Sequence, residues 1–166
     1  ADGSGLHLID INQTDARIRT VANFLSRYDP ERILVVSARQ YGQRPARKFA
    51  QSIGAKRIVG RFIPGTLTNP KLRTYTEPEV LVVTDPAADS QALSEAVSTG
   101  LPIVGIVDAN NTLRNVDLAL PANNKGRRSL ALIYWLLARE MLTSRGATNY
   151  ADWERAQDVE EWESTF

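Results

Sequence analysis

The sequence predicts an α/β fold: a doubly wound, mainly parallel five-stranded sheet with helices on both of its faces. Short apolar runs rich in β-branched residues recur along the chain, and the first five begin 27, 24, 23 and 23 residues apart. Continuous apolar runs of this length are typical of strands that are buried on both faces, as parallel sheets require. The segments between them have helical periodicity, and regular alternation of strands and helices indicates right-handed crossovers.

The predicted strands are these apolar runs, taken in chain order. They cover residues 6–11, 33–37, 57–60, 80–84 and 103–107, with a sixth and weaker run at 116–120. His7, the one histidine of the chain, alternates with apolar neighbours in the first run and is interpreted as a half-buried structural residue.

Four helices are predicted from apolar residues that repeat on one helical face. The first covers residues 14–28 and the third residues 89–99. The second is expected to begin near Pro45, because a proline in the first helical turn sacrifices no hydrogen bond. The last, over residues 129–144, is apolar almost all round, which predicts that it is buried or covered by a partner.

Composition excludes several classes of protein. Of the 166 residues, 43% are apolar and 23% are charged, as in ordinary globular proteins. The chain has no cysteine, which excludes disulfides and thiolate catalysis and favours a reducing, cytoplasmic setting. A single histidine leaves no conventional Ser-His-Asp site. The longest strongly apolar run, residues 130–137, is too short to cross a bilayer, and no signal-peptide pattern is present.

The net charge of +1 conceals a marked asymmetry. Residues 31–80 hold ten basic and three acidic residues, and residues 121–146 hold five basic residues and one acid. The final segment, 147–166, has one arginine and six acids. Of the 20 cations, 16 are arginine, whose planar guanidinium group can donate two parallel hydrogen bonds to a phosphate. This pattern indicates a nucleic-acid partner, although solvated helix faces would also account for it.

Acidic residues follow three of the predicted strands. Asp10, Asp85 and Asp108 would lie at the carboxyl ends of parallel strands, where such sheets bind ligands, and could hold magnesium for phosphoryl transfer. However, no second acid or lysine completes that arrangement, and capping and turn roles account for these residues better. Neither a dinucleotide fingerprint nor a phosphate-binding P-loop motif occurs in the chain.

The basic zones are the better candidate sites, because arginine beside a free helix N-terminus or a glycine-rich loop suits phosphate. One zone surrounds the start of the second helix, a second lies along the irregular stretch 61–78, and a third precedes the last helix. The predicted RNA-binding residues are Arg39, Gln40, Arg44, Arg47, Lys48, Arg61, Thr66, Thr68, Asn69, Lys71, Arg73, Lys125, Arg127 and Arg128.

The chain is expected to divide into a single α/β domain, residues 1–146, and an acidic-aromatic tail, residues 147–166. The tail carries Trp153, Trp162 and Phe166, which are costly to leave in water. We expect it to be mobile in the free domain and to dock on a neighbouring protein through these aromatic side chains. The competing interpretation is that it packs back on the last helix.

Four stretches of the sequence resemble a known family. They are GRFIPGTLTNP at residues 60–70, EPEVLVVTDPAADSQAL at 77–93, RQYGQRPARKFAQSIGA at 39–55, and VDLALPANNKGRRSLALIYWLLARE at 116–140. In their residues and in their order along the chain, these stretches are similar to the S-two family of small-subunit ribosomal proteins, in the archaeal and eukaryotic branch that includes the laminin-receptor precursor.

This resemblance implies a flavodoxin-like domain without enzymatic activity, substrate or obligatory cofactor. It further implies a place on the small ribosomal subunit, with small-subunit rRNA and neighbouring ribosomal proteins as partners and no membrane. The 60–70 loop and the NNKGRR turn at residues 123–128 would belong to the assembly surface. Two alternatives remain at this point: a magnesium-dependent phosphoryl-transfer enzyme on the same type of sheet, and a small-molecule-binding regulatory domain.

Overall fold

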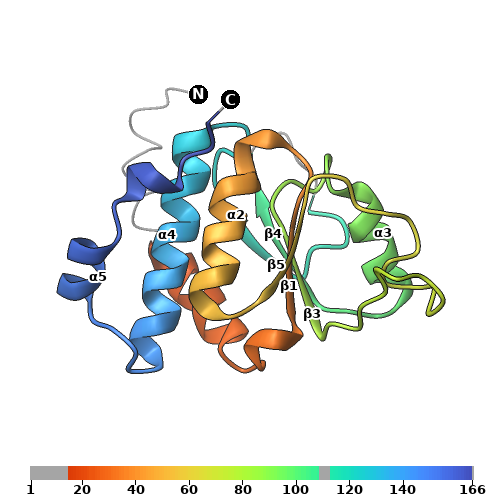
Figure 1. Ribbon diagram of the computed structural model, residues 1–166, viewed down its shortest axis with the longest axis horizontal. Coiled ribbons are helices and arrows are strands. Elements are labelled where there is room, and N and C mark those ends of the chain that lie inside the picture. Colours follow the sequence, from red (N-terminus) through yellow and green to blue (C-terminus); the bar gives the residue numbers. More distant parts are fainter. Residues whose placement is uncertain (1–14, 109–112, 166) are drawn as a thin grey trace.

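The computed structural model describes residues 15–108 and 113–165. Its sheet contains five parallel strands: β1 (Ile33–Ser37), β2 (Lys56–Val59), β3 (Val80–Val83), β4 (Ile103–Val107) and β5 (Leu118–Pro121). The strand order is β2-β1-β3-β4-β5, which is the flavodoxin-like order. The predicted fold class is therefore confirmed (Figure 1). The weak sixth run supplies β5, whereas the predicted strand at residues 6–11 lies outside the described residues.

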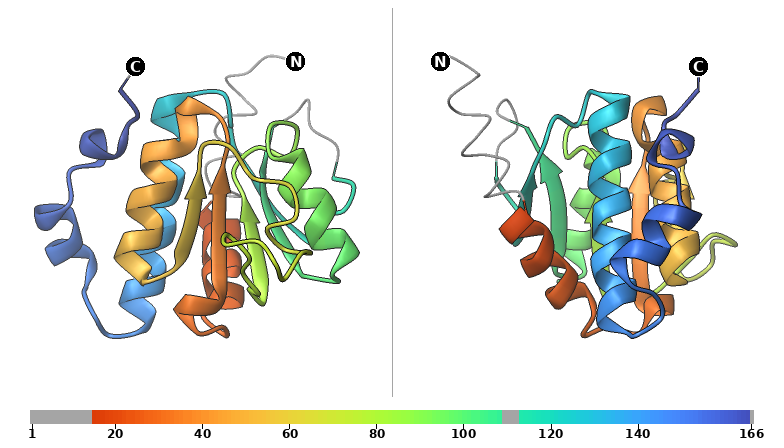
Figure 2. Two further views of the ribbon diagram at one scale, coloured as in Figure 1. Left: turned by 45° about the vertical axis from the view of Figure 1, so that its right-hand side comes forward. Right: turned by 90° about the vertical axis from the view of Figure 1, so that its left-hand side faces the viewer.

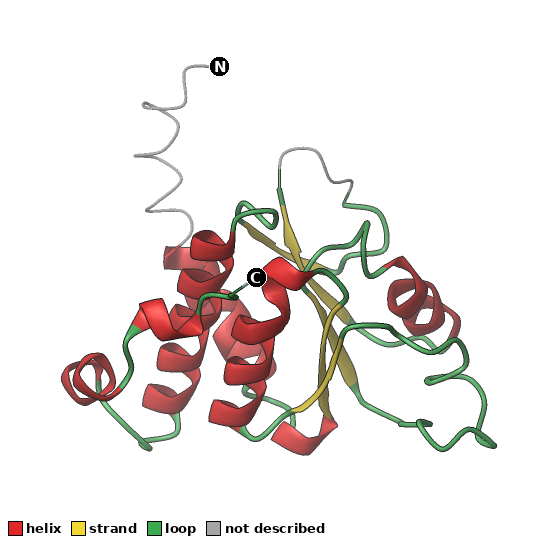
Figure 3. Ribbon diagram, turned by 45° about the horizontal axis from the view of Figure 1, so that its top comes forward, coloured by secondary structure: helices red, strands yellow, loops and turns green. Residues whose placement is uncertain are grey.

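Helices cover both faces of the sheet. The helix over residues 15–25, α2 (Gln40–Ile53) and α4 (Arg127–Ser144) pack on one face, and α3 (Ser90–Ser98) covers the other (Figures 1 and 2). Two apolar cores result, because the strand side chains alternate between the two faces: Val35 and Val82 belong to the first core, and Leu34 and Leu81 to the second. Figure 3 shows the long loop between β2 and β3 on the same side as α3.

The start of α2 differs from the prediction. The helix begins at Gln40 rather than near Pro45, so the proline lies inside the helix and removes one of its hydrogen bonds. The carbonyl oxygen of Tyr41, four residues earlier, instead accepts a hydrogen bond from the hydroxyl of Ser164, at 3.1 Å. A side chain from the far end of the chain thus supplies the bond that the proline cannot make.

The C-terminal segment, residues 147–165, folds back on the domain. Its elements are α5 (Tyr150–Ala156) and a short 3-10 helix, η2 (Val159–Trp162), which lie against the outer side of α4 (Figure 1). The rings of Trp135 and Trp153 are 5.9 Å apart, and those of Trp153 and Trp162 are 5.8 Å apart. The indole N–H of Trp135 also donates to the carbonyl oxygen of Gln157, at 3.1 Å. The cover predicted for the last helix therefore comes from this chain itself.

These contacts correct the prediction for the tail aromatics. Trp153 and Trp162 are buried in the chain's own core, so their side chains are not available to a partner protein in this conformation. The competing interpretation, packing against the last helix, is the one that the structure supports. Phe166 lies outside the described residues. Among the helices of the described ranges, none is both long and apolar enough to span a membrane.

Candidate nucleic-acid interface

The parallel sheet brings two of the predicted basic zones to one end of the molecule. All five strands point the same way, so the segments that follow β1, β2 and β5 emerge together at the carboxyl end of the sheet. These segments contain the start of α2, the start of the 61–78 loop with Arg61, and the turn that precedes α4. The loop then crosses the α3 side of the sheet and returns to the opposite end, where β3 begins.

The carboxyl end also contains the crevice in which folds of this order bind phosphates or nucleotides. The segments that follow the neighbouring strands β1 and β3 leave in opposite directions there, because β1 connects to β2 on one side and β3 connects to β4 on the other. In this protein Asp89 fills the crevice. Its two carboxylate oxygens accept hydrogen bonds from the backbone N–H of Ala38, at 2.7 Å, and of Asp85, at 3.0 Å.

The environment of Asp89 is tightly closed. Burial raises the pKa of its carboxyl to about 6, although the backbone hydrogen bonds act in the opposite direction. Helix α2 also lies directly on the strand ends at Gly42: a β-carbon there would be 2.5 Å from the methyl group of Thr84 and 2.7 Å from the hydroxyl of Ser37. Two backbone donors at these strand ends, the N–H groups of Ala38 and Asp85, are therefore already used by the protein.

Asp85 has the structural role that turn chemistry predicts. One carboxylate oxygen accepts the N–H of Ala87 at 3.0 Å, and the other lies 3.0 Å from Nε of Arg39. Because Asp85 is buried, Arg39 is the main source of compensating charge for it. Arg39 is thus held in an ion pair and is a weaker candidate for RNA than the sequence suggested. Asp10 lies outside the described residues. Within the described ranges, no three acidic or histidine side chains are grouped as a metal site.

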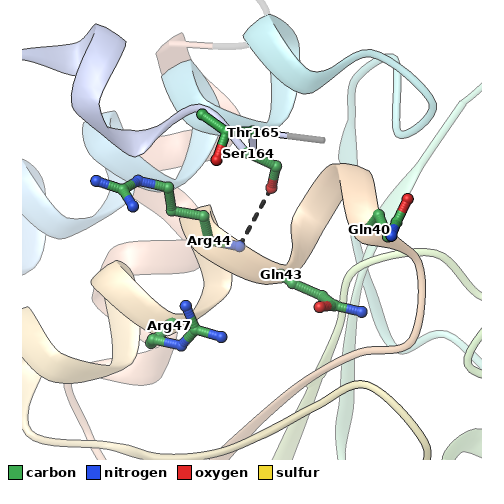
Figure 4. A pocket seen from close by; sticks show the side chains of 6 residues that line it. All are labelled: Gln40, Gln43, Arg44, Arg47, Ser164 and Thr165. Atoms are coloured by element: carbon green, nitrogen blue, oxygen red, sulfur yellow. Dashed lines mark hydrogen bonds between the residues drawn. The ribbon is translucent and has the colours of Figure 1, made fainter.

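The C-terminal segment covers part of the zone at the start of α2. The backbone N–H of Arg44 donates to the hydroxyl of Ser164 at 3.2 Å, as Figure 4 shows. Nε of Arg44 also donates to the carbonyl oxygen of Glu161. Gln40 and Arg47 line a shallow pocket beside these contacts, together with Thr165, and Lys48 is half-buried further along the helix. The backbone N–H and the guanidinium of Arg44 therefore both form hydrogen bonds within the chain, whereas the side chain of Gln40 is exposed.

The third zone is open to solvent. Lys125, Arg127 and Arg128 are exposed, and the side chain of Arg128 is 90% exposed, with its Nε 4.0 Å from a carboxylate oxygen of Glu163. The turn that presents these cations is fixed by Asn124, which is fully buried and donates to the carbonyl oxygen of Ile106 at 3.0 Å. A buried asparagine thus ties an exposed basic turn to the central sheet.

The 61–78 loop separates its predicted residues into buried and exposed sets. Thr66 is 1% exposed, and its hydroxyl donates to the carbonyl oxygen of Ile63 at 2.6 Å, so its side chain is not presented to a partner in this structure. The other predicted residues of the loop are exposed: Arg61, Thr68, Asn69, Lys71 and Arg73. None of the three cations among them forms an ion pair with a described residue.

Sequence reasoning missed residues of two kinds. Lys56 and Arg57 are exposed on β2, the edge strand of the described sheet, and extend the basic surface next to the loop. Glu95 of α3 is buried and accepts hydrogen bonds from the loop backbone. The available signal was an acid on the inner face of a predicted helix, between Ala92 and Ala96, where an unpaired charge is unfavourable.

Comparison with known proteins gives consistent matches. Residues 70–144 match the family model described as Ribosomal protein S2. The chain is 57% identical over 143 residues to the small ribosomal subunit protein uS2 of Haloquadratum walsbyi, which covers 86% of this chain and 51% of that protein. It is 58% identical over 144 residues to the uS2 protein of Methanoregula boonei, covering 87% of this chain and 71% of that protein.

The chain thus spans about half the length of the first of these curated relatives and more than two thirds of the second. Identity at this level extends over the sheet, the long loop and the turn before α4. On these matches, the chain belongs to the ribosomal protein S2 family, the uS2 proteins of the small ribosomal subunit.

Proposed function

We propose that this chain is a structural constituent of the small ribosomal subunit that binds small-subunit rRNA and neighbouring ribosomal proteins in the cytoplasm. The observation that carries this proposal is the identity of 57–58% to two uS2 proteins over most of the chain. Members of the family are structural constituents and not enzymes, so no substrate or catalytic residue is assigned.

The exposed cations suit this function. Arginine and lysine side chains that point into solvent can neutralise backbone phosphates without reading base edges. We assign this role to the residues that keep an exposed or half-exposed polar side chain: Gln40, Arg47, Lys48, Lys56, Arg57, Arg61, Thr68, Asn69, Lys71, Arg73, Lys125, Arg127 and Arg128. Arg39 and Arg44 contribute less directly, because their guanidinium groups are bonded within the chain.

The enzymatic alternative has less support. A phosphoryl-transfer site at the carboxyl end of the sheet would need the amides of Ala38 and Asp85 and a carboxylate free for the metal. Asp89 accepts hydrogen bonds from both of those amides, whereas Asp85 accepts one from Ala87 and forms an ion pair with Arg39. The crevice therefore acts as a polar core that holds α2 and α3 against the strands.

Two measurements test the proposal. A tagged chain expressed in a related archaeon should sediment with small subunits in a sucrose gradient, and a chain that sediments only as free protein would contradict it. Binding of the purified chain to small-subunit rRNA should also weaken steeply with salt, by about 0.7–0.9 log unit of affinity per log unit of salt for each phosphate contact. A flat salt response would show that protein partners, and not RNA, hold the chain in place.

A further inference from the structure

The loop between β2 and β3 consists of a neck and a tip. The neck is formed by residues 65–67 and 74–76, which are joined by a hydrogen bond from the N–H of Thr76 to the carbonyl oxygen of Thr66, at 2.9 Å. The hydroxyls of Thr66 and Thr74 are also 3.3 Å apart. Residues 68–73 form the tip, in which every side chain except that of Leu72 is exposed. The tip holds Thr68, Asn69, Lys71 and Arg73.

Glu95 fixes the neck to α3. One of its carboxylate oxygens accepts the backbone N–H of Gly65 at 2.8 Å, and the other accepts that of Leu67 at 3.0 Å. The side-chain amide of Gln91 donates to the first oxygen at 2.9 Å. The two backbone bonds lie on either side of Thr66, and the side chain of Leu67 packs in the second core.

The geometry of Gly65 makes this anchor specific. Its φ of +94° lies in the left-handed region, and a β-carbon there would be 2.9 Å from a methyl carbon of Leu72. Its carbonyl oxygen accepts the N–H groups of Thr68 and Asn69, at 3.1 and 2.7 Å, so the chain turns at once into the tip. The direction in which the tip leaves α3 is thus set by the residue that Glu95 holds.

The anchor requires an ionised carboxylate. Burial alone would raise the pKa of Glu95, but the hydrogen bonds from Gly65, Gln91 and Leu67 outweigh it and hold the pKa below its usual range. Both oxygens must accept hydrogen bonds at the same time. An amide in place of the carboxylate has one acceptor oxygen and would present donors to the other N–H group.

We infer that Glu95 is a positioning residue for RNA binding: its carboxylate holds the loop neck so that Lys71 and Arg73 are presented to the phosphate backbone in a fixed arrangement. This inference rests on the proposed function, because it concerns how the same surface engages RNA. Glu95 itself is 6% exposed, so the inference gives it no direct contact with RNA. Its contribution is preorganisation, since a loop that is already ordered loses less conformational entropy on binding.

The decisive test is the direction of the effect of Glu95→Gln in the full chain. This substitution makes the protein more positive, which by charge alone should strengthen binding to rRNA. Loss of the anchor should instead weaken binding to purified small-subunit rRNA by about tenfold. Glu31→Gln is the matched control, because it makes the same charge change at an exposed residue of the short 3-10 helix η1 (Pro30–Arg32), outside the loop. It should bind at least as tightly as the wild type.

Hydrogen exchange measures the anchor without RNA. The amides of Gly65 and Leu67 should exchange at least tenfold faster in Glu95→Gln, whereas the amides of β3 should keep their protection. Gln91→Ala removes one donor to Glu95 without changing charge and should shift both measurements in the same direction, by a smaller factor. It also provides the test if Glu95→Gln does not fold.

A variant cycle separates positioning from general stability. In a chain that already carries Lys71→Ala and Arg73→Ala, adding Glu95→Gln should have almost no further effect on rRNA affinity. Equal losses in both backgrounds, or undiminished binding by Glu95→Gln alone, would overturn the inference. Failure of the wild-type chain to bind rRNA would contradict the proposed function, and unchanged exchange at Gly65 and Leu67 would contradict the anchor separately.

Discussion

The start of α2 and the tip of the β2–β3 loop are both rich in cations, yet the fold treats them in opposite ways. Arg39 is paired with buried Asp85, and Arg44 is bonded to the carbonyl oxygen of Glu161. Lys71 and Arg73 are exposed, while the carboxylate of Glu95 is directed at the backbone of the neck. Equal positive charge in the sequence therefore gives unequal capacity to bind phosphate, because the intramolecular partners differ.

Removal of the C-terminal segment should have the largest effect, because this segment both covers Arg44 and completes the core on α4. A chain that ends at Gly146 loses the buried side chains of Trp153 and Trp162, each of which would cost about 3–5 kcal/mol as an alanine substitution. We expect the melting temperature to fall by about 10–20 °C. Differential scanning calorimetry measures this, with a chain that ends at Thr165 as the control. A shift below about 3 °C would favour the docking interpretation of the tail.

Charge removal at the loop tip should separate RNA binding from stability. Lys71→Ala with Arg73→Ala should reduce the slope of log affinity against log salt by about 1.4–1.8, since two phosphate contacts are lost. Its unfolding free energy should remain within about 0.5 kcal/mol of the wild type, because both side chains are exposed. Filter binding across a salt series and urea unfolding measure the two effects. An unchanged slope would remove the tip from the interface.

Arg39→Ala should give the reverse result. It leaves the buried carboxylate of Asp85 without its cation, which should lower the unfolding free energy by about 1–2 kcal/mol, a figure reduced for the partial exposure of Arg39. The slope of log affinity for rRNA against log salt should change by less than about 0.7–0.9, the value expected for one phosphate contact. Arg39→Lys, which keeps the charge, is the control in the same urea unfolding and filter-binding experiments. A large change in slope with unaltered stability would contradict the assignment of Arg39 to the core.

The crevice under α2 should give the protein a specific pH dependence. Because the pKa of Asp89 is raised from 3.8 to about 6, the folded state binds a proton more readily than the unfolded state between these values. The contribution of Asp89 to stability is therefore greatest below pH 4 and is lost as pH rises through 6. It amounts to about 1–3 kcal/mol.

Asp89→Asn isolates this contribution. The difference in unfolding free energy between the wild type and this variant should fall as pH rises from 4 to 7, and urea titrations at several pH values measure it. At pH 7 the variant also loses one accepted backbone hydrogen bond. A difference that does not vary with pH would show that the pKa of Asp89 is the same in the folded and unfolded states.

The smallest effect is expected at the open turn. Arg128 is 90% exposed, and its ion pair with Glu163 spans 4.0 Å. Arg128→Ala should change the unfolding free energy by less than about 0.5 kcal/mol. Thermal melts at low and high salt provide the measurement. A larger loss would indicate that Arg128 holds the C-terminal segment in place, as Arg44 does.

The sequence predicted what depends on local pattern. The strands at 33–37 and 103–107 match the structure to the residue, because a short apolar run bounded by turn residues has few other solutions. The start of α2 could not be predicted in this way. The carbonyl oxygen that Pro45 leaves without its helical donor accepts a hydrogen bond from Ser164, which is more than 100 residues away and has no local signature. Thr66 and Thr68 are alike in sequence, and they differ only in how the neck of the loop is folded.

The bond between Ser164 and Tyr41 has a consequence for the order in which the protein matures. The first turns of α2 are synthesised long before residue 164, since chains fold from the N-terminus as they emerge. Until that residue is made, the carbonyl oxygen of Tyr41 and the N–H of Arg44 lack the partner that they have in the folded chain. The basic end of α2 therefore reaches its final form late in synthesis, when the acidic segment that covers Arg44 arrives together with the hydroxyl that completes the helix.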